Sequence, residues 1–193
     1  MEHSLELVGT IIGLFYLWFE YRASIYVWIT GIVMSSICMI IYYQNGLYAD
    51  FGISLGYFLI SIYGWFVWKQ RKRPREKEKE TELKITSIST CLLPQLIASF
   101  VMVLMAIAWV LIHYTERDVV WLDSFTTSLS IIGLWMLAHK YVEQWGCWFI
   151  VAIVSSCLYV HKAHYFTAGF YALYAVISFF GYRKWKCMMD SPL

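Results

Sequence analysis

The chain has 193 residues, of which 60% are hydrophobic and 15% are charged, and its formal net charge is +2. Soluble domains are roughly 45–50% apolar, so this composition argues against an ordinary soluble domain. The basic residues stand at the ends of apolar runs instead of covering one face, which gives nucleic-acid binding little support. The five cysteines have no Cys-x-x-Cys spacing and are interpreted as small hydrophobic residues, not as disulfide or metal sites.

Seven apolar stretches are long enough to cross a bilayer once interfacial Tyr, Trp and His extend the shorter ones, since a crossing takes roughly 17–25 residues. The first stretch differs from a signal peptide because its basic residue follows the apolar run and no small-residue cleavage site comes after it. The pattern therefore predicts an all-α membrane protein. The predicted helices are Leu5–Phe19, Ile25–Tyr43, Asp50–Trp68, Ile88–His113, Ser124–Ala138, Trp145–Val160 and Thr167–Tyr182.

The long polar segment Lys69–Glu82 reads K-Q-R-K-R-P-R-E-K-E-K-E-T-E and divides the chain. The positive-inside rule places it in the cytoplasm, together with Arg183, Lys184 and Lys186. Seven crossings then put the amino terminus outside and the carboxyl terminus inside. The predicted divisions are a first three-helix repeat over 1–69, a charged cytoplasmic linker over 70–87, a linker transmembrane helix over 88–114, a second three-helix repeat over 115–186 and a cytoplasmic tail over 187–193.

The chain repeats itself at a separation of 117 residues, without a gap from Gly13 to Lys69. An aromatic-rich composition alone does not place three tryptophan pairs in one register. Because a single helix between the repeats restores the chain direction, the repeats are expected to be parallel, in a 3+1+3 transporter plan with a substrate site at the midplane between the halves. The pairs are Trp18 with Trp135, Trp28 with Trp145, Tyr42 with Tyr159, Tyr48 with Tyr165, Gly52 with Gly169, Tyr57 with Tyr174, Ser61 with Ser178, Gly64 with Gly181 and Trp68 with Trp185.

A few polar residues near the ends of the predicted helices are candidates for the site. An ionisable residue inside a membrane is costly unless it has a partner or faces an aqueous cavity. Glu20 fits such a role, and it fits a surface ion pair with a neighbouring arginine equally well. Asp50 and Asp123 are more typical of helix N-capping. The hydroxyls of Thr127 and Ser130 can bind substrate or donate to carbonyls of their own helix.

Indole rings are the second class of candidate, because an indole face attracts an organic cation by roughly 0.5–2 kcal/mol. Trp65 and Trp68 lie three residues apart, so both can face one cavity near the inner end of the third helix. Trp18 and Trp135 stand at matched positions of the repeats. Aromatic residues at helix ends also form interfacial belts. The candidate substrate-binding residues are Trp65, Trp68, Glu20, Trp18, Trp135, Thr127, Ser130, Ser54 and Tyr174.

Several segments resemble the PnuC family of bacterial vitamin transporters: N-G-L-Y, S-I-Y-G-W-F-V-W-K, D-S-F-T-T-S-L-S, K-Y-V-E-Q-W and Y-A-L-Y-A-V-I-S-F-F-G-Y-R-K-W. The likeness spans the chain apart from the charged linker and the fourth helix. It implies an uncoupled facilitator in the inner membrane, with a SWEET-like 3+1+3 arrangement, that takes up nicotinamide riboside or a relative. It also implies a homotrimer with no cofactor and no enzymatic activity, whose substrate a cytoplasmic kinase traps by phosphorylation.

The chain departs from the family pattern at several positions. Nicotinamide riboside carriers of this family often have glutamine where this chain has Ser54, Val67 and Leu134, and asparagine or aspartate where it has Ala152. Those side chains suit a ligand with a carboxamide and a ribose. Glu20 stands at a position that is usually small. Thiamine fits these changes better, because the indoles can surround its cationic thiazolium and the carboxylate of Glu20 can bind its aminopyrimidine. Thiamine is therefore the favoured substrate, and nicotinamide riboside is the alternative.

Three other classes of protein fit the sequence less well. A membrane enzyme would need a nucleophile or a metal constellation, and the five histidines stand near predicted helix ends without ligand spacing. A primary pump would need a phosphate loop, and no Gly-x-x-x-x-Gly-Lys occurs. A vitamin-binding S-component of an ATP-driven importer is the alternative from another class, although the parallel repeat and the basic linker argue against it.

Overall fold

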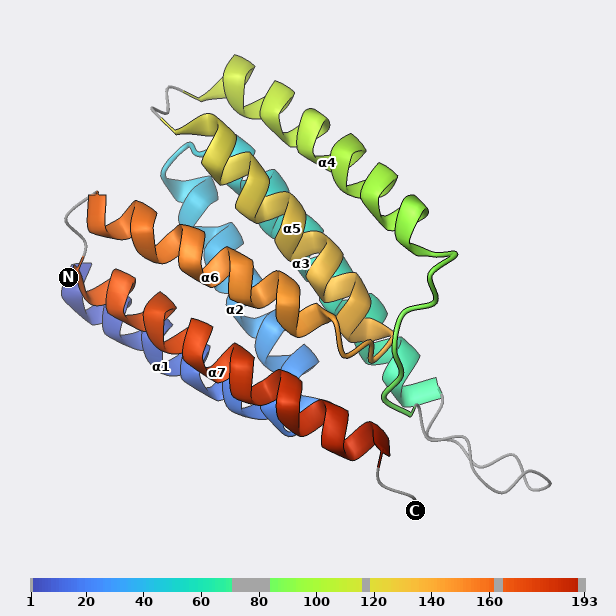
Figure 1. The fold of residues 1–193 in the computed structure, drawn as a ribbon. Helices are drawn as coiled ribbons and strands as arrows, with labels where there is room; N and C mark the ends of the chain where they lie inside the picture. The colour runs from blue at the N-terminus through green and yellow to red at the C-terminus, as the bar shows by residue number, and fades with distance from the viewer. Residues whose placement is uncertain (1, 71–83, 116–118, 162–164, 191–193) are drawn as a thin grey trace. The chain divides into compact units, whose positions relative to one another are not determined.

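The structure is a computed structural model that describes residues 2–70, 84–115, 119–161 and 165–190, with side chains described from residue 11 onward. The described residues form seven α-helices and an isolated β-bridge between Thr86 and Tyr141, so the predicted all-helical fold is confirmed. The helices are α1 (Glu2–Tyr21), α2 (Tyr26–Gln44), α3 (Tyr48–Gln70), α4 (Leu93–Tyr114), α5 (Val120–Ala138), α6 (Gln144–His161) and α7 (Tyr165–Asp190), shown in Figure 1.

The helices form two compact units, Met1–Lys84 and Ile85–Leu193. In the first unit α2 packs against both α1 and α3. In the second unit α5 packs against α4 and α6, and α6 packs against α7, as the neighbouring ribbons of Figure 1 show. The fourth helix therefore belongs to the same unit as the last three helices.

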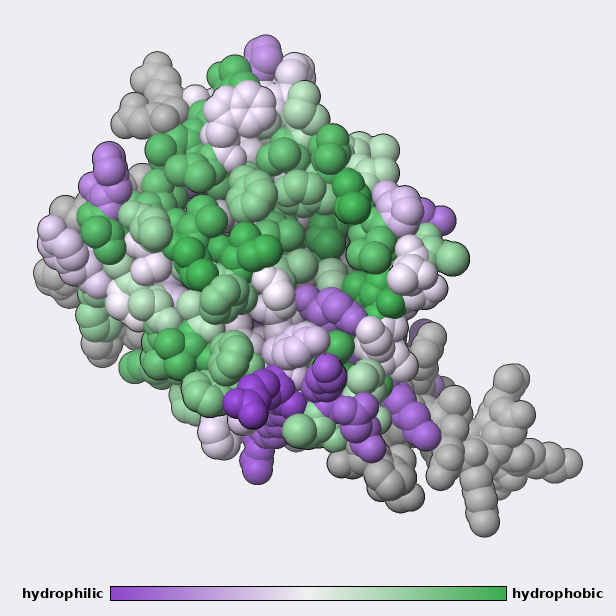
Figure 2. All heavy atoms as spheres, viewed as in Figure 1, coloured by the Kyte–Doolittle hydropathy of each residue, from purple (hydrophilic) through white to green (hydrophobic). Residues whose placement is uncertain are grey.

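The helices have the polarity of a membrane protein, with large apolar side chains exposed and polar side chains buried. Phe15 and Met102 are more than half exposed, whereas Ser124 and Gln144 are completely buried. Figure 2 shows apolar side chains covering broad areas of the visible face. Among the described residues, α2 to α7 are long and apolar enough to cross a membrane, and the apolar part of α1, Ile11–Tyr21, is shorter. Six such helices indicate a multi-pass membrane protein.

The fourth helix begins later than the sequence pattern predicts. It was expected from Ile88 and begins at Leu93, with Pro94 in its first turn, where the missing N–H has no helical partner to lose. The residues before it bind the loop between α5 and α6 instead. The backbone N–H of Ile88 donates to a carboxylate oxygen of Glu143 at 3.1 Å, and the hydroxyl of Ser87 donates to the other oxygen.

The last helix is longer than predicted. It was expected to end at Tyr182 and continues to Asp190, so it includes residues that the sequence analysis assigned to a tail. No proline or glycine stands between Gly181 and Asp190, so nothing in that part of the sequence interrupts the helix. The central part of the predicted charged linker, residues 71–83, lies outside the described residues.

The two units contain matching tryptophan pairs at the separation of 117 residues. The rings of Trp28 and Trp68 pack edge to face, with centroids 5.7 Å apart and an interplanar angle of 85°. The rings of Trp145 and Trp185 pack in the same way, at 5.9 Å and 84°. Each pair joins the second and third helices of its group of three. The two helix pairs are thus packed through equivalent contacts.

A glycine lies beneath the first ring of each tryptophan pair. A Cβ atom at Gly64 would lie 2.4 Å from the indole of Trp28, and a Cβ atom at Gly181 would lie 2.7 Å from the indole of Trp145. Real Cβ atoms do not approach other atoms this closely. Glycine is therefore required at both positions for the helices to approach.

The turn after the first helix of each group also repeats. Ala23 and Lys140 have positive φ angles of 50° and 55°. The next residue, Ser24 or Tyr141, donates its backbone N–H to the carbonyl five residues earlier, at 2.9 and 3.0 Å. This is the Schellman geometry of a helix C-terminus, formed here without glycine.

Candidate functional site

The buried face of α3 is polar over much of its length. Asp50, Ser54 and Ser61 are buried, and so are Gly64 and Trp68 further along the same helix. Their spacing of three, four or seven residues keeps them on one side of the helix. A membrane helix gains nothing from burying carboxyl and hydroxyl groups unless they serve packing partners or a ligand, so this face marks the interior of the first unit as a candidate site.

A cluster of polar side chains lies in the first unit, and we call Tyr16, Glu20, Tyr57 and Ser61 the acidic cluster. Glu20 is 0% exposed, and both Glu20 and Tyr57 are close enough to Tyr16 to interact electrostatically with its hydroxyl. A Cβ atom at Gly31 would lie 2.9 Å from the Ser61 hydroxyl oxygen and 3.7 Å from the Tyr16 ring. Two helices, α1 and α3, thus contribute a carboxylate and several hydroxyls, and α2 approaches them at Gly31.

The burial of Glu20 decides between the two roles that its sequence position allowed. A surface ion pair with Arg22 is wrong, because Glu20 has no exposed surface. The Arg22 guanidinium carbon lies 5.3 Å from the ring centroid of Trp18, which is 55% exposed. A buried carboxylate is costly in a membrane protein unless it binds a partner or a ligand. Its burial beside the hydroxyl of Tyr16 makes Glu20 a candidate for contact with a substrate.

The two tryptophans of the predicted cage are already engaged within the first unit. The Lys69 ammonium group lies 4.3 Å from the ring centroid of Trp65, whose ring also contacts Phe66. Trp68 is 3% exposed and packs against Trp28. In this conformation Trp68 has almost no surface left for a ligand, and one face of Trp65 is occupied by a cation of the protein itself. The cage stays a prediction that requires a different conformation.

The candidates of the second unit are spread along α5. Trp135 packs against His139 in a tilted arrangement, with ring centroids 4.3 Å apart and an interplanar angle of 36°. The hydroxyl of Ser130 donates to the backbone carbonyl of Thr126 at 2.7 Å, which is the local bond that its sequence position allowed. Thr127 is half-buried. The structure does not gather these residues around a single point.

Two residues of the second unit were missed by the sequence analysis. Gln144 is completely buried, and its side-chain oxygen accepts a hydrogen bond from the Trp148 indole N–H at 2.6 Å. Trp148 stacks on the predicted site residue Tyr174, with centroids 5.9 Å apart and an interplanar angle of 25°. The repeat offers a signal for finding them, because Trp148 stands where the first unit has Gly31.

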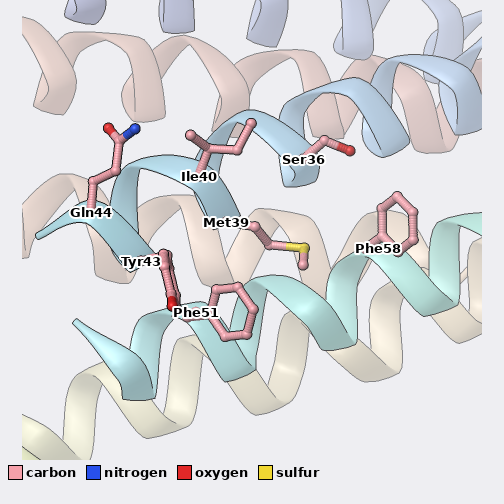
Figure 3. A pocket seen from close by; sticks show the side chains of 7 residues that line it. All are labelled: Ser36, Met39, Ile40, Tyr43, Gln44, Phe51 and Phe58. Carbon is pink, nitrogen blue, oxygen red and sulfur yellow. The ribbon is translucent and has the colours of Figure 1, made fainter. Parts of the chain in front are cut away.

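An open groove of about 510 Å³ lies between α2 and α3, and Figure 3 shows the side chains that line it. Most of these side chains are apolar, and none is charged or belongs to the acidic cluster. The groove therefore has no charged side chain that could pair with a cation. It is lined by Ser36, Met39, Ile40, Tyr43, Gln44, Phe51 and Phe58.

The described residues provide binding groups and no evident catalytic centre. Within the described ranges, no three His, Cys, Asp or Glu side chains are grouped so that they could hold a metal ion. The buried hydroxyls of Ser61, Ser128 and Ser178 donate to carbonyls of their own helices. Such an arrangement can hold a small polar ligand in an apolar surrounding.

Comparison with known proteins gives a consistent result. The Escherichia coli nicotinamide riboside transporter PnuC is 25% identical over 202 residues, covering 94% of this chain and 84% of that protein. The riboflavin/roseoflavin transporter RibM of Streptomyces davaonensis is 22% identical and covers 93% of this chain and 83% of that protein. The crystal structure of the vitamin B3 transporter PnuC has the same fold, with a TM-score of 0.71 at 21% identity, covering 95% of this chain and 80% of that chain.

The model of the nicotinamide mononucleotide transporter family matches residues 3–187, which is nearly the whole chain. The relatives and the structural neighbour are membrane transporters and not enzymes. With its apolar helices and its buried polar cluster, the chain therefore belongs to the nicotinamide mononucleotide transporter family, as a PnuC-type B-vitamin transporter of the membrane.

Proposed function

We propose that this protein carries a small aromatic B-vitamin cation across the membrane by facilitated diffusion, with nicotinamide riboside as the first candidate. Relatives in Escherichia coli and Neisseria mucosa are named for nicotinamide riboside, and none of those described above is named for thiamine. The relatives thus support nicotinamide riboside better than the thiamine preference expected from the sequence. Both molecules carry a permanent positive charge on an aromatic ring.

The observation that carries this proposal is the burial of Glu20. A carboxylate with no exposed surface inside a membrane protein attracts a cation strongly, because few water molecules screen it. The pyridinium of nicotinamide riboside and the thiazolium of thiamine both fit that charge. Riboflavin, which appears in the name of the relative RibM, is neutral and provides a matched comparison.

Thiamine is the second candidate, and a different observation favours it. Ser54, Leu134 and Ala152 are all buried, and these are positions where the resemblance implies amide or acidic side chains in nicotinamide riboside carriers. Without such side chains, the buried polar groups of a ribose and a carboxamide have fewer partners. A ligand without a ribose therefore loses less binding free energy at these positions than nicotinamide riboside does.

We also propose that the two groups of three helices are parallel repeats joined by α4, in the 3+1+3 plan. The matching tryptophan pairs and turns support this plan. The positive-inside rule supports an outer amino terminus and a cytoplasmic carboxyl terminus in a bacterial inner membrane. A reporter inserted within Lys69–Glu82 should then be cytoplasmic, and a reporter before His3 should be outside. Both reporters on the same side would contradict the plan.

The assembly and the metabolic setting are proposals from the family resemblance. We propose a homotrimer, and we propose that a cytoplasmic kinase phosphorylates the vitamin and so prevents its return. Cross-linking followed by mass measurement in detergent would test the trimer.

Calorimetric titration of the purified protein tests the substrate directly. Nicotinamide riboside, thiamine and riboflavin are titrated separately under identical conditions. We expect saturable binding of the two cations, tighter for nicotinamide riboside, and weak or no binding of riboflavin. Tighter binding of thiamine would move the proposal to the second candidate. Binding of riboflavin alone, or of no vitamin, would contradict it.

A further inference from the structure

Tyr16 places a hydroxyl group in the interior of the first unit, and this hydroxyl has no hydrogen-bond partner among the described residues. The residue lies one helical turn before Glu20, and its hydroxyl interacts electrostatically with Glu20 and Tyr57. Native structures rarely leave a buried hydroxyl without a hydrogen bond, because its desolvation costs free energy that a hydrogen bond would offset. An exception beside a buried carboxylate requires an explanation.

The second unit shows that helix packing does not require this pair. Gly133 stands at the position equivalent to Tyr16, and Leu137 stands at the position equivalent to Glu20. In the second unit, the indole of Trp148 comes within 3.6 Å of the Cβ position of Gly133. Equivalent helices are thus packed without the hydroxyl and without the carboxylate, which argues against a purely structural role for both groups.

The second helix of the first unit approaches the acidic cluster closely at a glycine. Gly31 stands where the second unit has Trp148. A single added carbon at Gly31 would come within 2.9 Å of the Ser61 hydroxyl oxygen and within 3.7 Å of the Tyr16 ring. Glycine therefore keeps a side chain of α2 away from these groups.

We propose that Tyr16 is a specificity-determining residue whose hydroxyl, together with the Glu20 carboxylate, binds an N–H or O–H group of the transported cation. This inference rests on the proposed function, because it assigns one contact within the same site. A phenol oxygen accepts a hydrogen bond from such a group, and the carboxylate accepts a second one. Nicotinamide riboside presents ribose hydroxyls and a carboxamide, and thiamine presents an aminopyrimidine.

The variant Tyr16→Phe removes only the hydroxyl oxygen and tests the proposal. We expect the affinity for nicotinamide riboside and thiamine to fall about tenfold, which is a typical loss for one hydrogen bond. The melting temperature should not fall, because the deleted oxygen has no hydrogen-bond partner among the described residues. The control is Tyr26→Phe in the same unit, where the side chain is 56% exposed. It should change neither quantity.

Gly31→Ala is a second variant that leaves the phenol in place. It introduces a methyl group beside Ser61 and Tyr16 and should also weaken binding, in protein whose melting temperature shows that it is folded. Binding of both cations at wild-type affinity by folded Tyr16→Phe protein would overturn the inference and leave the proposed function intact. A lower melting temperature with unchanged affinity would assign the hydroxyl a structural role and overturn the inference as well. Failure of the wild-type protein to bind either vitamin would overturn both proposals.

Discussion

The two units fill equivalent spaces between their helices with different side chains. In the first unit, the space between the first two helices of the group is filled from α1, by Tyr16 with Glu20 one turn later. In the second unit, the equivalent space is filled from α6, by Gln144 with Trp148 one turn later. Each solution pairs an aromatic ring with a polar side chain four residues away. One polar group is an acid and the other is an amide.

The packing contacts are the same in both units, and the polar contacts differ. The edge-to-face tryptophan pairs differ by only 0.2 Å in centroid separation, at 5.7 and 5.9 Å. The acid at Glu20 is replaced by the apolar Leu137. A vitamin cation has one charged ring and different groups around it, so two identical binding surfaces would not match it. We infer that shared contacts maintain the fold and that unshared polar groups select the ligand.

The largest expected effect comes from the tryptophan pairs. Trp68→Ala and Trp185→Ala should each lower the free energy of unfolding by about 3–5 kcal/mol, because each removes a buried indole from an equivalent pair. Denaturant unfolding in detergent measures the loss, with the exposed Trp109→Ala as control. If Trp68→Ala lost vitamin affinity and kept full stability, the predicted indole cage would be right and the shared-scaffold account wrong.

Glu20→Gln should have the next largest effect, and on affinity rather than on stability. It keeps the size and removes the charge, so binding of either cation should weaken by about 1.5–3 kcal/mol, the range for hydrogen bonds to charged groups. The control is Glu143→Gln, because Glu143 binds Ser87 and Ile88. An equal loss of affinity in both variants would show that the effect of Glu20 is not local.

The glycines beneath the indoles should give a smaller and matched loss of stability. Gly64→Ala and Gly181→Ala each force a methyl group against a ring and should cost about 1–3 kcal/mol, with the tighter Gly64 site losing more. Gly56→Ala and Gly169→Ala are controls, because a Cβ atom there meets nothing within 4 Å. If the Gly64 and Gly181 variants unfolded at the same denaturant concentration as the two controls, the close approach of the helices at these glycines would be contradicted.

The smallest effect is expected at the partly exposed end of the first unit. Lys69→Met removes the ammonium group from the face of Trp65 and should cost about 0.5–1 kcal/mol of stability. Tyr182 and Lys186 stand at the equivalent positions of the second unit, and Lys186→Met provides the comparison. A marked gain of vitamin affinity in Lys69→Met would show that Trp65 competes for the ligand cation.

Much of the fold could be predicted from the sequence, because apolar length determines membrane helices and a fixed separation reveals equivalent residues. Trp28 and Gly64 were recognised with their partners because their residue types are the same in both units. Tyr16 and Trp148 were missed for the opposite reason, since the two units fill this space with different residues. The late start of α4 could not be predicted, because it depends on contacts with Glu143, more than 50 residues away.

The burial of Glu20 is a feature of the candidate site that the sequence could not predict. Its position before Arg22 allowed an exposed ion pair as easily as a buried carboxylate, and the packing of α1 excludes the former. The packing partner of Trp68 could not be predicted from the sequence either. Helical spacing indicates the side of the helix on which the indole lies, but not the ring against which it packs.

Uptake into proteoliposomes tests the central claim most directly. Labelled nicotinamide riboside is added outside, with thiamine as a parallel substrate and Glu20→Gln protein as control. The account predicts saturable uptake that stops when the inner and outer concentrations are equal, is unaffected by proton or sodium gradients and is weakened in the variant. Accumulation well above the outer concentration without an internal kinase, or no uptake of either cation by folded protein, would contradict it.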